Sequence, residues 1–280
     1  MAIDLSFVGQ SIDPVPFAYT DRDVIRYALG IGAKAAELDF LYEGRGPKVF
    51  PTFAVVPAYE ALMAAMARAG IGFDKVVHGH QKITMHGPLP PEGKLLTTAT
   101  IEGIYDLKKM AQVVVRTRTV DSRTDKAFFD TEWGIIVFGE GGWGGQPPPP
   151  RETALPSRPC DAEVEQVTSP EQALLYRLMG DGNPLHADPA FPLVIERFGG
   201  RPILHGLCSY GFLARAVAQA FCGGDATRVK HLAARFTKPV FPGDTLRTEL
   251  WREGDKVWAR VTTRERGEPC LSQCYAELSE

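Results

Sequence analysis

Hydrophobic and polar residues follow the same order of patterns twice along this chain. In the first half, the stretch Asp21–Gly30 predicts a short helix that ends in glycine, and the alanine-rich stretch 51–70 predicts a longer helix. Four strand-like, mainly apolar stretches separated by turn residues come next. We expect these strands over residues 76–85, 95–105, 110–120 and 128–138.

The second half repeats this order at an offset of about 150 residues. A short helix is expected over residues 169–179 and a longer one over Gly206–Phe221. Strands are expected over residues 229–237, 246–252, 256–264 and 270–278, with a hairpin turn at residues 253–255. One long helix followed by antiparallel strands in each half predicts an α+β fold in which a curled sheet wraps a central helix, twice over. This arrangement is a double hotdog.

A glycine- and proline-rich stretch separates the two halves. Its sequence, GEGGWGGQPPPP, spans residues 139–150, where flexible glycines give way to prolines that favour an extended spacer. Such a stretch joins folded units rather than filling a core. We therefore expect an N-terminal domain over residues 1–140, a linker over residues 141–160 and a C-terminal domain over residues 161–280.

Composition and charge argue against several classes of protein. The hydrophobic content of 44% supplies a core, while the net charge of -3 and the pI of ≈ 6.1 provide no basic field for a nucleic acid. The five cysteines are an odd number without Cys-x-x-Cys spacing, which argues against a disulfide framework and a zinc knuckle. No signal core follows Met1, and no apolar run approaches the roughly 20 residues that cross a bilayer. Because the C-terminus also lacks a Ser-Lys-Leu peroxisomal address, the expected compartment is the cytoplasm.

The densest group of reactive side chains lies in the sequence GDGNPLH, residues 180–186. Glycines and an Asn-Pro pair prevent a continuous helix there, so a turn can bring Asp181 and His186 toward one point. A carboxylate beside an imidazole can polarise a water molecule and transfer protons near neutral pH. Asn183 is expected to hold that water or the loop. The alternative is a capped turn in which Asp181 and Asn183 bond their own backbone and His186 packs on the core.

Two further interpretations involve neighbouring residues. His205 could join Asp181 and His186 as a metal ligand, but no further ligand falls at a familiar spacing, so no metal site is expected. Asp188 precedes a proline and is expected to cap a helix whose first residue is Pro189. We therefore assign Asp188 no chemical role.

The start of the second long helix is a candidate site for a developing oxyanion. A helix that begins near Gly206 leaves backbone N–H groups free at its positive end, and glycine lets a flat thioester approach the backbone closely. An ordinary glycine at a helix start is the alternative. Cys208 and Ser209 lie beside His205, but the sequence is one residue out of a Gly-x-Ser-x-Gly elbow, which argues against a covalent nucleophile.

Two other groups of polar residues are candidates for ligand contact. Arg235 and Lys238 lie at the end of a predicted strand, where they could meet phosphate groups or be solvated surface charges. His78 and His80 could present both imidazoles on one face of a strand. Because no third ligand lies nearby, a hydrogen-bonded strand end is the preferred interpretation of this pair.

Several stretches resemble the MaoC-like, type 2 enoyl-CoA hydratases. The run YRLMGDGNPLHADPAFPLVIERFGGRPILHGLCSYGFLARAV, residues 176–217, is similar to the catalytic half of that family, and RFTKPVFPGDTL, residues 235–246, to its second signature. In the first half, YALGIGA (27–33), the helix start at 51–53 and HGHQ (78–81) resemble the non-catalytic half of the two-domain, eukaryotic-type members. The resemblance spans nearly the whole chain and favours the acid–base interpretation over the capped turn.

The resemblance implies a role for each matching residue. Asp181 and His186 match the catalytic pair of the family, Asn183 its associated polar residue, and Gly206 the backbone donor to the thioester carbonyl. At the corresponding place in the first half, residues 31–34 contain neither Asp nor His. That half is therefore expected to accommodate the acyl tail instead.

The activity implied by the resemblance is hydration of trans-2-enoyl-CoA to (R)-3-hydroxyacyl-CoA, with no cofactor besides the CoA of the substrate. Arg235, Lys238 and His205 are expected to contact that substrate, and a homodimer is expected from the family. His80 stands where relatives often have an acidic residue, so its role is open. Three alternatives remain: a 3-hydroxyacyl-thioester dehydratase that acts on an acyl-carrier protein or a specialised CoA substrate, a hotdog acyl-CoA thioesterase, and an acyl-CoA-binding regulator without turnover. No nucleic-acid or membrane partner is expected.

Overall fold

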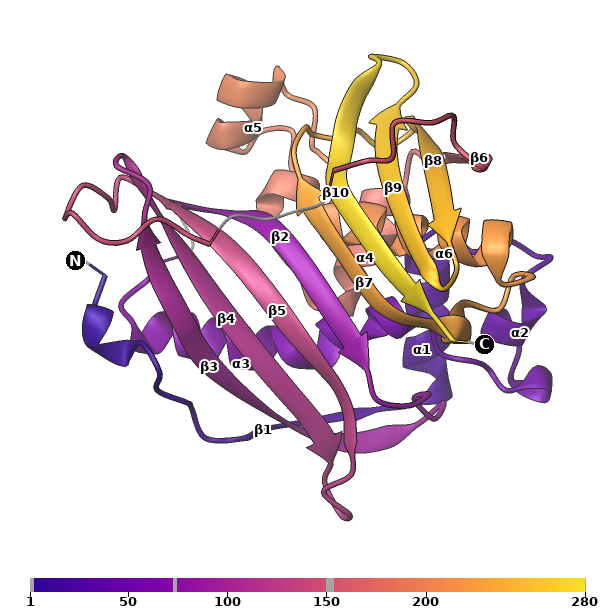
Figure 1. The fold of residues 1–280 in the computed structure, drawn as a ribbon, viewed down its shortest axis with the longest axis horizontal. Helices are drawn as coiled ribbons and strands as arrows, with labels where there is room; N and C mark the ends of the chain where they lie inside the picture. The colour runs from indigo at the N-terminus through magenta and orange to yellow at the C-terminus, as the bar shows by residue number, and fades with distance from the viewer. Residues whose placement is uncertain (1–2, 73–74, 150–153, 280) are drawn as a thin grey trace.

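Two long helices lie against one antiparallel sheet. The computed structural model describes residues 3–72, 75–149 and 154–279. Helix α3 (Val55–Arg68) belongs to the first half of the chain and helix α6 (Gly206–Phe221) to the second, and Figure 1 shows both on the same side of the sheet. Each long helix packs against strands of its own half. This is the predicted α+β, double-hotdog arrangement.

The order of elements is repeated in the two halves. The first half contains η1 (Leu5–Phe7), β1 (Val15–Tyr19), α1 (Asp21–Gly30), α2 (Leu38–Leu41), η2 (Glu43–Arg45), η3 (Pro51–Ala54), α3, β2 (Val76–Met85), β3 (Gly93–Asp106), β4 (Met110–Asp121) and β5 (Ala127–Phe138). The second half contains β6 (Ala162–Val167), α4 (Gln172–Tyr176), η5 (Arg177–Met179), η6 (Pro184–His186), α5 (Pro192–Phe198), α6, η7 (Ala226–Arg228), β7 (Val229–Phe236), β8 (Thr245–Glu253), β9 (Lys256–Thr263) and β10 (Glu268–Leu278). The predicted long helices and eight long strands are therefore present, with ends shifted by at most a few residues.

The spacing of apolar residues explains how the long helices pack. In α3, Val55, Ala58, Leu62 and Met66 recur every three or four residues and are each almost fully buried. Pro57 lies in the first turn of this helix, where its missing N–H needs no acceptor within the helix. In α6, every residue from 208 to 218 is buried, as expected for a helix that is surrounded by protein on all sides.

The sheet runs through both halves without a break. Its ten strands have the order β1-β3-β4-β5-β2-β7-β10-β9-β8-β6. The halves meet where β2 pairs antiparallel with β7, from His80 opposite Arg235 to Thr84 opposite His231. Figure 1 shows this joint at the centre of the molecule. The sequence predicted two curled sheets, and backbone hydrogen bonds between β2 and β7 merge them into one.

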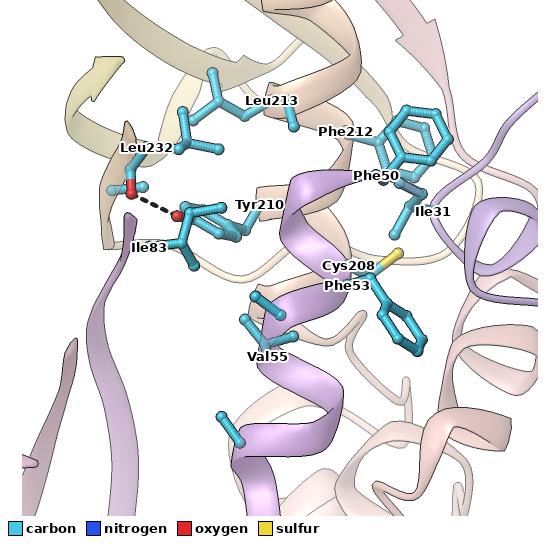
Figure 2. Close-up of a cluster of buried hydrophobic side chains, with 14 of the residues drawn as sticks. Ile31, Phe50, Phe53, Val55, Ile83, Cys208, Tyr210, Phe212, Leu213 and Leu232 are labelled. Carbon is cyan, nitrogen blue, oxygen red and sulfur yellow. Dashed lines mark hydrogen bonds between the residues drawn. The ribbon is translucent and has the colours of Figure 1, made fainter. Parts of the chain in front are cut away.

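Buried side chains also tie the two halves together. Figure 2 shows residues from the start of α3 and from α6 in a single cluster, with the Tyr210 hydroxyl donating a hydrogen bond of 2.6 Å to the carbonyl of Leu232. Gly211 of α6 packs directly on Ile31 of the first half: a Cβ added at Gly211 would lie 2.3 Å from the Ile31 side chain. This close approach requires glycine at position 211.

A buried ion pair crosses the same boundary. The Arg215 guanidinium of α6 is only 8% exposed and donates to both carboxylate oxygens of Glu37, with an Nε–Oε1 distance of 3.0 Å. Its Nη1 also donates to the carbonyl of Ile31 at 3.3 Å. These contacts satisfy a charge that would be costly to bury alone.

The structure corrects the sequence prediction at several short elements. The edge strands β1 and β6 were not predicted, and the helix expected over residues 169–179 is divided into α4 and one 3-10 turn, η5. Asp188 does not cap a helix at Pro189. Its side chain instead accepts a hydrogen bond of 2.8 Å from the Ala190 N–H in a local turn, and α5 begins only at Pro192.

The linker contains no helix or strand in its described parts, residues 141–149 and 154–160. Pro150 and residues 151–153, also predicted as linker, lie outside the described residues. The glycine-rich part is fixed to the first half by Asp106, whose carboxylate accepts hydrogen bonds from the N–H groups of Gly142 and Gly144. No helix in the described residues is both long enough and apolar enough to span a bilayer.

Candidate active site

A cavity of about 680 Å³ lies between the two halves of the molecule. The loop from Asp181 to His186 and the start of α6 form one wall. Side chains of α3 and β5 form another, mainly apolar part of the lining, among them Tyr59, Met63 and Trp133. The cavity therefore combines reactive groups from the second half with an apolar surface from the first.

Glycine and local hydrogen bonds determine the shape of the loop from Gly180 to His186. Gly180 ends η5 in a left-handed conformation with φ of 110°, which favours glycine. The Asp181 carboxylate then accepts from the Asn183 N–H at 3.1 Å, and the Asn183 side chain accepts from the Leu185 N–H at 3.0 Å. Pro184 starts a 3-10 turn that ends at His186. Asn183 thus shapes the loop, and the two reactive side chains both line the cavity.

His186 is held in one orientation by a backbone carbonyl. Its Nδ1 lies 2.8 Å from the carbonyl oxygen of Ile203, and because a carbonyl can only accept, Nδ1 carries the proton of this bond. Nε2 of a neutral His186 is then left with a free lone pair. Burial lowers the pKa of His186 from its ordinary value of 6.5, while the Asp181 carboxylate opposes this shift. His186 is therefore a neutral base at physiological pH.

Asp181 and His186 are close enough to share one water molecule. One carboxylate oxygen of Asp181 and one ring nitrogen each of His186 and His205 all lie within 4.8 Å of one another. A water molecule that is hydrogen-bonded to two groups lies about 2.8 Å from each, so one water molecule spans this separation. The side chain of Asp181 is 27% exposed, which leaves the pair accessible from the cavity.

His205 lies flat against His186. The ring centroids are 3.8 Å apart with an interplanar angle of 26°, and Tyr176 packs on His205 at 4.9 Å. His205 is 2% exposed, and neither ring nitrogen has a hydrogen-bond partner among the described residues. Burial is the largest of the causes that lower the pKa of His205 to about 2; the proximity of His186, which repels His205 when both are protonated, and that of Arg177 add to it, while the Asp181 backbone opposes it. His205 is therefore neutral and cannot act as a cation toward phosphate.

The stacked rings also argue against a shared metal ion. A metal ion binds an imidazole nitrogen in the plane of the ring, along its lone pair. Because the rings of His186 and His205 lie nearly parallel and face to face, their lone pairs run side by side and do not converge. The spacing of these groups with Asp181 thus suits proton transfer better than metal binding.

The start of α6 offers unpaired backbone donors to the cavity. The His205 carbonyl accepts from the N–H groups of Cys208 and Ser209, and no side chain caps the helix. In the described part of the chain, no acceptor faces the N–H groups of Gly206 and Leu207. Gly206 lines the cavity, and a Cβ there would lie 2.9 Å from the Phe236 ring. These two donors at a helix N-terminus suit a developing negative charge on oxygen.

Cys208 is not available as a nucleophile. Its thiol is fully buried and donates to the carbonyl of Gly30 at 3.2 Å. Burial raises the pKa of Cys208 well above the ordinary thiol value, so the reactive thiolate does not form. The surroundings of Cys208 thus disfavour covalent catalysis by this thiol.

Of the two predicted cations, only Lys238 borders the cavity. Its side chain is 56% exposed and lies 4.0 Å from Glu268. Arg235 is exposed on β7 one residue before Phe236, which lines the cavity. Because neighbouring residues on a strand point to opposite faces, Arg235 is directed away from the cavity. The sequence predicted that both cations lie at the end of a strand, but it did not predict which face of the sheet each side chain occupies.

His78 and His80 are separated by an irregularity in β2. The strand pairing shifts between these two residues, since His78 lies opposite Ile135 while His80 lies opposite Gly134. His78 lines the cavity, whereas His80 bonds the carboxylate of Glu132 at 3.0 Å. The two imidazoles therefore do not share a site, and the bond from His80 to Glu132 is in line with the preferred interpretation of hydrogen-bonded strand histidines. Tyr59 and Ser209, which line the cavity, were given no role from the sequence.

The corresponding loop of the first half borders a different cavity, of about 600 Å³. Lys34, Glu37 and Arg215 are among its lining residues, and the last two form the buried ion pair described above. Since residues 31–34 contain neither Asp nor His, the acid–base pair of the second half has no counterpart in this loop.

Comparison with known proteins assigns the chain to a family. The profile of the MFE-2 hydratase 2 N-terminal domain matches residues 17–139, and that of the MaoC like domain matches residues 152–271. The chain belongs to the MaoC-like hydratase 2 family. The members of this family are hydro-lyases.

Individual relatives cover most of the chain. It is 41% identical over 261 residues to 3-hydroxyacyl-thioester dehydratase Y of Mycobacterium tuberculosis, covering 90% of this chain and 88% of that protein. It is 38% identical over 282 residues to the peroxisomal multifunctional enzyme type 2 of Mus musculus, covering 97% of this chain. The chain spans only 38% of the length of that mouse enzyme.

Solved structures of other proteins show the same fold. The MaoC-like dehydratase from Phytophthora capsici is 30% identical, with a TM-score of 0.87 and coverage of 99% of this chain and 98% of that one. A Mycobacterium tuberculosis protein that is 15% identical, with a TM-score of 0.59 and coverage of 97% of this chain and 96% of that one, is described as a double hotdog fold. The double hotdog predicted from the sequence is thus confirmed.

Proposed function

We propose that this chain catalyses the reversible hydration of trans-2-enoyl-CoA to (R)-3-hydroxyacyl-CoA. The observation that carries the proposal is the placement of Asp181 and His186 within reach of one water molecule, in the same cavity that the start of α6 lines with its free N–H groups. The relatives named as enoyl-CoA hydratase 2 in Arabidopsis thaliana and 3-hydroxyacyl-thioester dehydratase in Mycobacterium tuberculosis support it, as does the (R) product implied by the family.

In the proposed reaction, the thioester carbonyl accepts hydrogen bonds from the Gly206 and Leu207 N–H groups. Conjugation makes the β-carbon electrophilic, and these donors stabilise the enolate-like charge as water adds to it. His186 Nε2 takes one proton from the attacking water while the Asp181 carboxylate orients that water. The pair then delivers a proton to the α-carbon, so that one water molecule has been added in total. The addition of water involves no net oxidation or reduction, and the proposed steps therefore require no redox cofactor.

The two walls of the cavity divide the rest of the substrate between them. The apolar wall formed by α3 and β5 suits the acyl tail, because burying each methylene gains about 0.8 kcal/mol. Lys238 at the cavity border is placed to meet a phosphate of CoA, whereas Arg235 on the other sheet face is not. We further expect a homodimer in the cytoplasm, which light scattering and cell fractionation would check.

The test measures turnover of short-, medium- and long-chain enoyl-CoA by the loss of conjugated enoyl absorbance, followed by chiral analysis of the product. Asp181→Asn and His186→Gln should each lower kcat by about 10²–10⁴-fold with little change in KM. Asp188→Asn is the matched control, because this nearby carboxylate serves a local turn outside the cavity lining. Folded Asp181→Asn and His186→Gln variants that keep ordinary turnover would refute the proposed site.

The same assay separates the alternatives. A thioesterase attacks the carbonyl and releases free thiol, which a thiol reagent detects. A dehydratase of acyl-carrier-protein thioesters turns over the carrier-bound substrate faster than the CoA ester. A regulator binds acyl-CoA without turnover. The unpaired base Nε2 of His186 favours turnover over binding alone.

A further inference from the structure

The face-to-face contact between His205 and His186 is not explained by substrate binding. His205 was expected to contact the substrate, yet its ring is 2% exposed and neutral, and it lies at 3.8 Å on the ring of His186. Its Nε2 is 3.9 Å from Asp181 Oδ2, beyond hydrogen-bond distance. The contact of His205 with the site is therefore made through the flat face of its ring, against the proposed base.

We propose that His205 is a positioning residue for His186, which holds the plane of that imidazole and stabilises the imidazolium that forms when His186 takes a proton from water. This inference rests on the proposed function, in which His186 is the base. It assigns His205 a role through its ring and not through its nitrogens.

Two contacts define the plane of His186, and a third holds His205 in place. The Ile203 carbonyl fixes one edge of the ring through Nδ1, and the ring of His205 covers one face. His205 is itself held from the other side by Tyr176, which is 3% exposed. A packed ring whose neighbours are themselves packed keeps a catalytic group within the small angular range that proton transfer requires.

The electrostatics of the contact favour the protonated form of His186. The face of a neutral aromatic ring carries partial negative charge and attracts a cation that lies on it. The imidazolium of His186 would then have this face on one side and the Asp181 carboxylate within 4.8 Å. A charged ring at position 205 would instead repel it. Since the pKa of His205 is about 2, its ring stays neutral throughout the catalytic cycle.

The nitrogens of His205 are dispensable under this proposal, because neither has a hydrogen-bond partner among the described residues. His205→Phe keeps an aromatic face and removes both nitrogens, while His205→Leu removes the face and both nitrogens. The two variants are both apolar and differ mainly in the ring. His205→Gln is a second ringless variant, which retains polar atoms and serves in place of His205→Leu if that variant fails to fold.

The experiment measures kcat and KM for one enoyl-CoA substrate, with thermal unfolding to verify that each variant is folded. His205→Phe should stay close to the wild-type kcat. The ringless variants should lower kcat by about 3- to 30-fold with KM little changed, which corresponds to the range of about 0.7–2 kcal/mol for a cation on an aromatic face.

Two results would overturn the proposal. Equal losses of kcat in His205→Phe and His205→Leu would show that the nitrogens or the general packing matter, and not the ring. Unchanged kcat in the ringless variants would show that the stacked ring is dispensable. Asp181→Asn, measured in parallel, separates this from the proposed function: if it retains normal turnover, the site itself is wrong, whatever the His205 variants do.

Discussion

Acid should destabilise this protein well above the pH at which most carboxylates titrate, because several histidines are buried in the neutral form. The pKa of His78 is lowered to about 3, by burial and by the nearby His80, and that of His205 to about 2. In the unfolded chain both would have a pKa of about 6.5. Below pH 6.5 the unfolded state therefore binds protons that the folded state does not, and stability falls as the pH falls.

The size of this effect follows from the two shifts. At pH 5, which is 1.5 units below the unfolded pKa, each of these histidines costs about 2 kcal/mol, so the pair costs about 4 kcal/mol relative to pH 7. The pKa values of His186 and His231 are also lowered by burial and act in the same direction. A loss of about 4 kcal/mol is a large share of the 5–15 kcal/mol that stabilises a typical folded domain.

Urea unfolding at pH 5, 7 and 8 measures the free energy of unfolding directly. We expect the loss between pH 7 and 5 and little contribution from these histidines between pH 7 and 8. In His205→Phe, the difference between pH 7 and 5 should shrink by about 2 kcal/mol, because one buried imidazole has been removed. A wild-type protein equally stable at pH 5 and 7, or a variant with the wild-type difference, would contradict this reasoning.

Three further predictions concern the site and the joint between the halves. Neutral His186 is the proposed base and its pKa lies below 6.5, so kcat/KM should decline only below pH 6.5 in a pH titration. In the residual activity of Asp181→Asn this decline should move to still lower pH, because the Asp181 carboxylate raises the pKa of His186. Glu37→Ala should lower the free energy of unfolding by about 3 kcal/mol in urea titrations, because it leaves the buried Arg215 guanidinium without its carboxylate partner. Replacing both Glu37 and Arg215 by Met should lower the free energy of unfolding by less. Met63→Trp should reduce kcat/KM for a ten-carbon enoyl-CoA relative to a four-carbon one by about 15-fold, the cost of about 1.6 kcal/mol for excluding two methylenes from the cavity.

The sequence predicts best what depends on local patterns. The long helix Gly206–Phe221 and the strand Val76–Met85 have the predicted bounds, since their apolar periodicity is strong and glycine or proline marks their ends. The short edge strands β1 and β6 escaped prediction because few residues define them and their pairing partners are far away in the sequence.

For the candidate site, residue types and spacing marked Asp181, His186 and Gly206 as candidates, and the family resemblance favoured their chemical roles over the structural alternatives; all three line one cavity. The direction in which a side chain points was not predictable where its strand is irregular, or where its contact partner is far away in the sequence. His78 and His80 separate because of a shift in strand pairing, and the stacking of His205 on His186 joins segments that no sequence period relates. Such contacts depend on tertiary packing and on no local preference.

The hydrogen bonds between β2 and β7 limit how the two halves can be exchanged. A chimera that receives its first half from a relative must bring a strand whose edge matches β7 in register, or the joint will leave unpaired backbone groups on both sides. It must also bring a residue that pairs with Arg215 and a side chain at position 31 that fits against Gly211. We place acyl-chain preference on α3, so it can be transferred to another protein only together with these contacts between the two halves.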